Sequence, residues 1–211
     1  MRELLRRGFF LLLVRPFLSI VIGLRVAGRK HLLTPDPVIV VANHNSHLDT
    51  PLLLSLFPLK RLSCLHPVAA ADYWLSSPLK RFVAETFFGI VPITRGGKGA
   101  GDPLEGLHAT LARGHSLLLF PEGTRGEPEV MGRFLGGAAR LAAAHRDVPV
   151  VPVHLRNAGR SLPRGTFLLV PFICDVTVGA PLRFPESASS KEIQTAIEDT
   201  VRELAGEDRQ Y

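Results

Sequence analysis

The chain has little cysteine and few aromatic residues. Cys64 and Cys174 are the two cysteines of 211 residues, and both lie in apolar runs without a basic neighbour or helix start that favours a thiolate. This pattern argues against a disulfide framework and favours two small core side chains. Aromatic residues make up 7% of the chain and do not alternate with a basic stripe, which argues against a nucleic-acid-binding module.

The chain also lacks an unbroken apolar run of the roughly 20 residues that a membrane span needs. Near the N-terminus, Arg15 and Pro16 interrupt two apolar runs that together extend from Gly8 to Leu24. An arginine near the centre of a span costs roughly 2.5 to 3.5 kcal/mol on insertion scales. Residues 1–30 are therefore predicted to be a membrane-associating segment of two short helical pieces in one leaflet, with arginines at the headgroups. A single tilted span is the alternative.

The overall composition lies between those of a soluble enzyme and a membrane protein. Hydrophobic residues make up 46% of the chain, the mean hydropathy is +0.19, and the formal net charge is +6. A basic chain suits a polyanionic partner, and both nucleic acid and an anionic lipid surface meet that description. The length fits one further domain, predicted at residues 31–211.

Short apolar runs alternate with helical patterns along residues 31–211. Strands are predicted at 38–42, 62–70, 90–94, 116–120, 148–155 and 167–178, and helices at 50–57, 72–88, 103–113, 134–145 and from 189 onward. Asp102 with Glu105, and Ser189 with Glu192, have the spacing of capping boxes at two helix starts. This alternation predicts an α/β layered domain whose largely parallel mixed sheet is flanked by helices.

A polar loop follows the first predicted strand and precedes an apolar helix. It contains His44 and Asp49, five positions apart. A carboxylate at that spacing is able to accept the imidazole Nδ1 proton and leave Nε2 free as a general base. The alternative for Asp49 is a helix N-cap before Pro51. His47 in the same loop suggests a zinc pair, but no suitable third ligand is nearby, so no metal site is predicted. Ser46 is better suited to cap a turn than to act as a nucleophile.

Two further loops end in arginines. Glu122, Gly123, Thr124 and Arg125 follow one apolar strand, and Arg95 ends another. A guanidinium is able to bind phosphate through two parallel hydrogen bonds, and glycines allow backbone N–H groups to approach an anion. Taken singly, each arginine suits a solvated surface position.

Four segments together resemble the glycerolipid acyltransferase family, whose type members are 1-acyl-sn-glycerol-3-phosphate acyltransferases. These segments occur in the family's order and spacing at residues 43–49, 89–95, 120–125 and 151–153. The resemblance implies that His44 is the base and Asp49 its orienting partner. It implies that Arg95 and Arg125 bind the acceptor phosphate, that the loop from Glu122 to Thr124 lies on the acceptor side, and that Val151, Pro152 and Val153 line the acyl region.

The implied reaction moves a fatty acyl group from acyl-CoA or acyl-carrier protein to the hydroxyl of 1-acyl-glycerol-3-phosphate, with no cofactor. The implied partners are the lipid acceptor, the donor and the membrane surface, and the implied location is the cytoplasmic face of a membrane. Another lysophospholipid or an aminolipid is the alternative acceptor, and a catalytically silent membrane-binding relative is the alternative class. Many family members have a lysine where this chain has Phe134 to Gly136, and Arg133 is a candidate replacement. Chain length, donor type and oligomeric state stay open.

Overall fold

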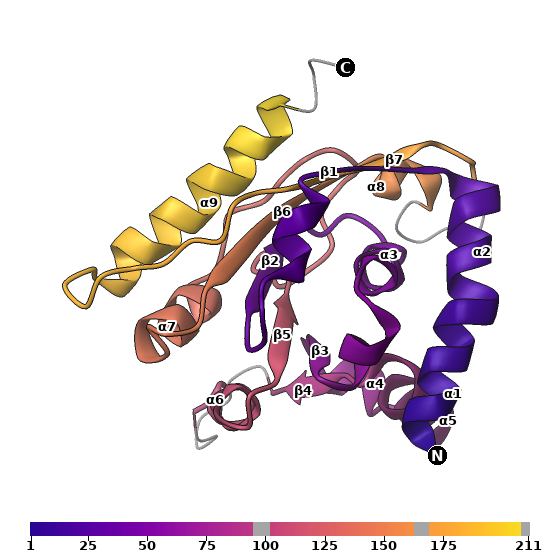
Figure 1. The fold of residues 1–211 in the computed structure, drawn as a ribbon, viewed down its shortest axis with the longest axis horizontal. Coiled ribbons are helices and arrows are strands. Elements are labelled where there is room, and N and C mark those ends of the chain that lie inside the picture. Colours follow the sequence, from indigo (N-terminus) through magenta and orange to yellow (C-terminus); the bar gives the residue numbers. More distant parts are fainter. Residues whose placement is uncertain (95–101, 163–168, 208–211) are drawn as a thin grey trace.

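The computed structural model describes residues 1–94, 102–162 and 169–207, and its centre is a seven-stranded sheet (Figure 1). The strand order is β1-β7-β6-β2-β5-β3-β4, and every neighbouring pair is parallel except β6 with β7. The strands are β1 (Leu24–Ala27), β2 (Ile39–Ala42), β3 (Leu65–Ala70), β4 (Val91–Ile93), β5 (Ser116–Leu119), β6 (Val150–Arg156) and β7 (Cys174–Val178). The predicted largely parallel mixed sheet is confirmed.

Helices cover both faces of this sheet. The α-helices are α1 (Arg2–Phe9), α2 (Arg15–Phe17), α3 (Asp49–Leu56), α4 (Ala71–Trp74), α5 (Pro78–Val83), α6 (Glu105–Ala112), α7 (Gly137–Ala144), α8 (Ala158–Ser161) and α9 (Ser190–Glu207). Wider π-helical turns are η1 (Phe10–Val14), η2 (Leu18–Ile22) and η5 (Ala84–Phe88), and tighter 3-10 turns are η3 (Arg29–Leu33) and η4 (Leu59–Ser63).

The side chains of β2 alternate between two separate core clusters. Val40 packs with the N-terminal helix and α3 on one face, whereas Ile39 and Val41 pack with α6, α7 and α9 on the other. The neighbouring strands β5 and β6 divide their side chains in the same way. Their apolar runs therefore show no polar face, because both faces of the sheet are covered.

Several element boundaries differ from the prediction. The segment predicted as one helix over 72–88 divides at Leu75–Ser77, where Ser77 accepts from the Lys80 N–H and starts α5. Helix α6 begins at Glu105, later than expected, because Asp102 caps a preceding turn through the Leu104 N–H. Strand β7 begins only at Cys174, and the first residues of the predicted strand, 167–168, lie outside the described ranges. The Ser189–Glu192 box is confirmed by hydrogen bonds in both directions.

The N-terminal segment forms one helical rod, and the prediction of two separate pieces is wrong. The backbone stays helical from α1 through η2, and it leaves the helix at Gly23 with φ +73°. Proline normally breaks a helix because it lacks an N–H and its ring meets the preceding turn. Here the π-turn η1 ends just before Pro16, and the Arg15 N–H donates five residues back to the Phe10 carbonyl. This wider turn accommodates the ring.

Arginines fasten this rod to the rest of the fold. The guanidinium of Arg6 is buried and donates to the carbonyl oxygens of Leu62, Leu65 (2.9 Å) and Phe88 (2.6 Å). Arg15 donates to Ser55 O at 3.1 Å and Phe57 O at 2.6 Å, at the end of α3. Arg6 is therefore buried within the fold, and the placement of the other arginines at lipid headgroups stays a prediction. Within the described ranges, no helix is long and apolar enough to cross a membrane. The division between residues 1–30 and 31–211 stays a prediction.

Candidate active site

The polar loop at residues 43–49 meets the loop at residues 120–125 because each follows one of two neighbouring parallel strands, β2 and β5. Both loops leave the carboxyl ends of their strands, which is where open α/β sheets place binding sites. The Gly126 N–H donates to the His44 carbonyl at 2.9 Å and joins the loops directly. Asn43 fixes the first loop on its other side, since its side chain exchanges two hydrogen bonds with the backbone of Leu155, at 2.9 and 2.7 Å.

The predicted contact between His44 and Asp49 is confirmed. His44 Nδ1 lies 2.8 Å from Asp49 Oδ2, which also accepts the backbone N–H groups of Asn45 at 2.7 Å and Ser46 at 2.8 Å. Because an ionised carboxylate only accepts, Nδ1 carries the ring proton and Nε2 has an unshared pair. Asp49 is fully buried and is the first residue of α3, whereas Leu48 is its N-cap residue. The alternative of Asp49 as the helix cap is therefore wrong.

Glu122 connects the loops through its carboxylate. One oxygen accepts the His44 N–H at 2.7 Å and the other accepts the Gly132 N–H at 2.8 Å. Burial raises the pKa of this carboxyl, and the two backbone donors partly offset that effect. Both oxygens of Glu122 bind backbone, so this residue holds His44 in place from behind. The sequence places Glu122 in this loop but gives no sign of these two backbone partners.

Two further residues of the loop at 120–125 contact histidine rings of the loop at 43–49. The ring of Phe120 stacks on His44 with centroids 4.1 Å apart, which restricts the tilt of the imidazole. Gly123 has a φ of +71°, and a side chain there would meet Leu135 at 2.8 Å, so the turn requires glycine. Arg125 Nη1 donates to His47 Nε2. Burial lowers the pKa of His47 most, and the nearby charge of Arg125 lowers it further. A lowered pKa favours the neutral imidazole, which is able to accept this hydrogen bond.

A cleft of about 740 Å³ opens in front of these loops. Its polar lining includes His44, His47, Thr124 and Arg125. Its apolar lining includes Val68, Tyr73, Trp74, Phe88, Ile90, Ile93, Leu104, Leu119 and Leu135. The ring of His44 faces this cleft, and its Nε2 has no hydrogen-bond partner among the described residues. A proton acceptor therefore borders a space with room for an acyl chain.

Some residues singled out from the sequence do not reach the cleft. Val151 and Val153 are buried in β6 and belong to the core, so the expectation that they line an acyl region is wrong. The reason is the central position of β6, whose side chains fill the core layers. Arg133 is exposed and does not line the cleft, so it does not replace the missing lysine there. Arg95 lies outside the described residues.

Ser46 has a structural environment. Its hydroxyl donates to Leu162 O at 3.0 Å and accepts the Leu48 N–H at 3.1 Å, and the side chain is buried. Both functions of the hydroxyl are thus used in closing the turn, which matches the capping role favoured from the sequence. In the part of the chain that the structure describes, histidine, cysteine and carboxylate groups form no cluster of three that is able to hold a metal ion.

The fold and the site define an α/β protein in which a buried aspartate orients a histidine that faces a cleft at the carboxyl edge of a mostly parallel sheet. A model of the Acyltransferase family matches residues 23–156, which is more than half of the chain, and the chain belongs to that family.

Several characterised proteins are similar to this chain. It is 32% identical over 149 residues to a chloroplastic 1-acyl-sn-glycerol-3-phosphate acyltransferase of Brassica napus. The matched residues cover 67% of this chain and 39% of that protein. The chain is 35% identical over 140 residues to a lyso-ornithine lipid O-acyltransferase of Pseudomonas aeruginosa, covering 66% and 50%. The crystal structure of the 1-acyl-sn-glycerophosphate acyltransferase PlsC from Thermotoga maritima matches with a TM-score of 0.78 at 21% identity, covering 100% of this chain and 80% of that one. The chain thus spans about two fifths of the length of the Brassica relative.

Proposed function

We propose that this chain transfers a fatty acyl group from a thioester donor to the free hydroxyl of 1-acyl-glycerol-3-phosphate, giving phosphatidic acid. One observation carries the proposal: the imidazole of His44, held by buried Asp49 at 2.8 Å, faces a cleft of about 740 Å³ that is lined by both polar and apolar side chains. A lysophosphatidate suits such a lining, since it has a phosphate and hydroxyl at one end and an acyl chain at the other.

In the proposed reaction His44 acts as the general base. Its Nε2 takes the proton of the acceptor hydroxyl while the hydroxyl oxygen attacks the thioester carbonyl carbon. The new C–O bond forms, the C–S bond breaks, and the leaving thiolate takes the proton from the imidazolium. Atoms and charge balance without a cofactor or an acyl-enzyme, because a thioester is already activated. His44 supplies the base, and the cleft supplies alignment.

Asp49 supports this proton transfer in two ways. It holds the Nδ1 tautomer, and its negative charge stabilises the imidazolium that forms when Nε2 is protonated. The two backbone N–H groups that it accepts, from Asn45 and Ser46, keep the carboxylate in place. Glu122 and Phe120 fix the backbone and the ring plane of His44, so the base is positioned before substrate arrives.

The acceptor phosphate is proposed to bind at Arg125, which lines the cleft. Arg125 suits a phosphomonoester, whose oxygens match the two-pronged geometry of a guanidinium. Gly123 and Thr124 also line the cleft and are proposed to complete the acceptor side of the loop. Arg95 is the second proposed phosphate ligand, from its place in the family pattern alone.

A second acceptor class has its own support. The Pseudomonas relative is named a lyso-ornithine lipid O-acyltransferase, and its identity over the matched residues is 35%. A zwitterionic aminolipid has no phosphomonoester for Arg125 to bind. The same His44 chemistry would then serve an acceptor hydroxyl in a different lipid.

The donor and the location complete the proposal. Acyl-CoA and acyl-carrier protein are the two thioester donors considered, and the protein is proposed to act at the cytoplasmic face of a membrane through its N-terminal helix. Leu12 and Ile20 of that helix are 77% and 83% exposed, which provides apolar surface for a leaflet.

An acceptor panel tests the proposal. Purified protein is incubated with lysophosphatidate, lysophosphatidylethanolamine and lyso-ornithine lipid, each with acyl-CoA and with acyl-carrier protein, and products are identified by mass. The proposal expects the highest kcat/KM for lysophosphatidate. A preference for lyso-ornithine lipid would transfer the assignment to the second class, and no product with any acceptor would contradict the acyltransferase proposal.

A further inference from the structure

Residues 71–83, comprising α4, α5 and the turn between them, present apolar side chains to solvent. Leu79 is 72% exposed and Phe82 is 54% exposed, and Tyr73 and Leu75 are also exposed. Single exposed apolar residues are ordinary on protein surfaces, but a group of them on one short segment marks an interaction surface. We call these four residues the α4–α5 patch.

Aromatic contacts connect the α4–α5 patch to the N-terminal helix. The ring of Phe82 lies 6.0 Å from that of Phe87, which in turn lies 4.6 Å from that of Phe9 in α1. Arg2 and Glu85 form an ion pair at 3.5 Å along the same junction. Figure 1 shows α4, α5 and the N-terminal end of α1 at one side of the molecule. The patch therefore extends the apolar surface of the N-terminal helix, where Leu12 and Leu13 are exposed.

The patch also borders the mouth of the cleft. Helix α4 directly follows β3, and its residues Tyr73 and Trp74 line the cleft. The ring of Trp74 lies 6.3 Å from that of Phe88, another lining residue. A surface that covers the patch would thus lie beside the part of the cleft that Tyr73 and Trp74 line.

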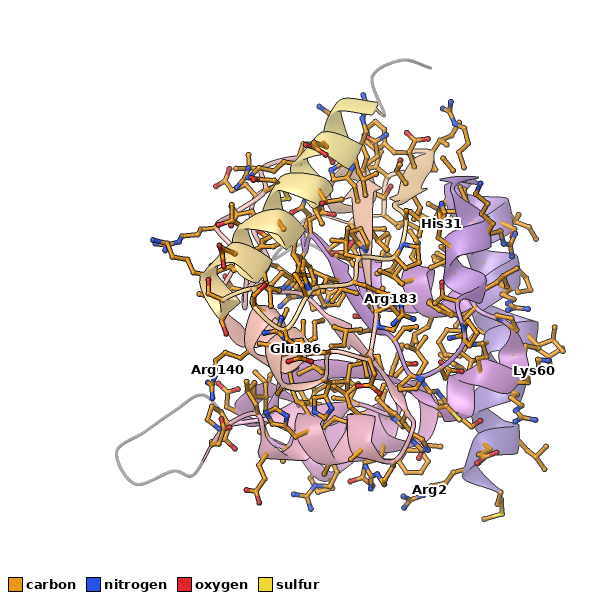
Figure 2. All side chains as sticks on the ribbon, turned by 60° about the vertical axis from the view of Figure 1, so that its left-hand side comes forward. Arg2, His31, Lys60, Arg140, Arg183 and Glu186 are labelled. Atoms are coloured by element: carbon orange, nitrogen blue, oxygen red, sulfur yellow. The ribbon has the colours of Figure 1, made fainter. Side chains whose placement is uncertain are left out.

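Basic side chains surround this apolar surface. Arg81 is exposed, and the Lys80 ammonium lies 4.4 Å above the ring of Tyr73. Figure 2 shows Arg2 and Lys60 on the side of the molecule that carries the N-terminal helix, with α9 on the opposite side. Asp72, Glu85 and Glu3 are acidic residues nearby, and Glu85 is paired with Arg2 and Glu3 with Arg7. Apolar residues with a basic rim suit the interface of an anionic bilayer.

We propose that the α4–α5 patch is a second membrane-contact surface, continuous with the N-terminal helix, which sets the mouth of the cleft on an anionic bilayer. A lysolipid then enters the cleft from the leaflet without passing through water. The entry route rests on the proposed function, but contact with the bilayer does not and is measured separately.

The single tryptophan of the chain, Trp74, allows a direct measurement on the unaltered protein. The full chain is mixed with vesicles of phosphatidylglycerol and phosphatidylcholine brominated on the acyl chains. Brominated phosphatidylcholine has no free hydroxyl, so it does not act as an acceptor. The proposal expects quenching of Trp74 emission by these vesicles. A protein that sediments with the vesicles while its Trp74 emission is unchanged would overturn it.

Two pairs of variants test the apolar and basic parts of the patch. Leu79→Ser with Phe82→Ser is expected to lower vesicle partitioning roughly tenfold, because the most exposed apolar groups are lost. Lys80→Gln with Arg81→Gln is expected to lower partitioning onto anionic vesicles roughly fivefold per residue. The loss should be smaller at high salt, which screens the charges. The matched control is Arg140→Gln with Arg183→Gln, which removes the same charge outside the patch; Figure 2 shows Arg140 on the side opposite Lys60 and Arg183 near the middle of the view.

The outcomes separate membrane contact from its competitors. Equal partitioning of the control and the Lys80/Arg81 pair would overturn the proposal. Loss of a dimer in the Leu79/Phe82 pair, with vesicle binding unchanged, would assign the patch to a second copy of this chain and also overturn it. Acyl transfer to lysophosphatidate in detergent micelles, together with unfolding by heat, is expected to match wild type in the Leu79/Phe82 pair. Failure of transfer in the wild type contradicts the proposed function alone.

Discussion

The carboxyl edge of the sheet and the N-terminal helix both bury charged side chains, but their hydrogen bonds differ in kind. At the edge, Asp49 accepts three hydrogen bonds and orients a ring whose other nitrogen faces a cleft. In the helix, Arg6 and Arg15 donate to backbone carbonyls of η4, β3 and α3. Buried charge prepares a reactive group in the first region and fastens a helix in the second. Substitutions in the two regions should therefore separate activity from stability.

The largest effect is expected at the His–Asp pair. His44→Ala should lower the rate of acyl transfer by roughly 10²- to 10⁴-fold, since it removes the proposed base. Asp49→Asn should cost less, but well over tenfold, because the base remains and its tautomer is no longer fixed. Turnover is measured with lysophosphatidate and acyl-CoA, and the melting temperature is measured alongside. Wild-type turnover in His44→Ala would contradict the mechanism.

Arg125 gives the next largest effect on activity. Arg125→Ala should lower kcat/KM for lysophosphatidate by roughly ten- to hundredfold, because it removes a charged hydrogen-bond donor, while the KM for the donor stays near wild type. Arg133→Ala is the matched control, since Arg133 is exposed and away from the cleft. Equal losses in the two variants would show that the acceptor phosphate does not bind at Arg125.

Arg6 tests the other side of the comparison. Burial lowers the pKa of its guanidinium to about 10, so it is protonated at neutral pH and donates to three carbonyl groups. Arg6→Met keeps the apolar stem but leaves those carbonyls without their donor, which should cost about 3 kcal/mol in the free energy of unfolding. Arg7→Met removes a half-exposed arginine whose ion pair is with Glu3 at 3.6 Å, and it should cost less than about 1 kcal/mol. Denaturant titration of both variants makes the measurement, and equal costs would show that Arg6 does not fasten the helix.

These two regions also show what the sequence was able to predict. The spacing of His44 and Asp49 predicted their contact, because a short turn brings residues five apart together, and the alternation of apolar runs predicted the parallel sheet. The anchoring role of Arg6 and Arg15 was not predictable, because their partners are backbone carbonyls distant in sequence, which leave no pattern of residue types. Glu122 was recognised as a loop residue, but its partners were not predictable for the same reason, because they are backbone N–H groups. Val151 and Val153 were misassigned because a family pattern records which residues recur, and a buried core position recurs as a binding position does.

The smallest expected effect is a pH dependence of stability. Burial lowers the pKa values of His47, His66 and His145 below the ordinary value of 6.5. The unfolded chain therefore binds more protons than the folded one below about pH 6.5, and the free energy of unfolding falls as pH drops through the folded pKa values. Glu122 acts in the opposite sense, since its raised pKa contributes stability that is lost as pH rises. Thermal unfolding between about pH 7 and about pH 5 measures the slope, and His145→Gln should flatten it. A stability that rises on acidification over that range would contradict the histidine assignments.

The central claim is that His44, oriented by Asp49, activates the acceptor hydroxyl for direct attack on the thioester. Rapid-mixing measurement of thiol release from acyl-CoA, with and without lysophosphatidate, tests it most directly. The account predicts that wild-type protein releases thiol only when the acceptor is present, and that His44→Ala releases almost none under either condition. A burst of thiol equal to the protein concentration in the absence of acceptor would show an acyl-enzyme and contradict the account.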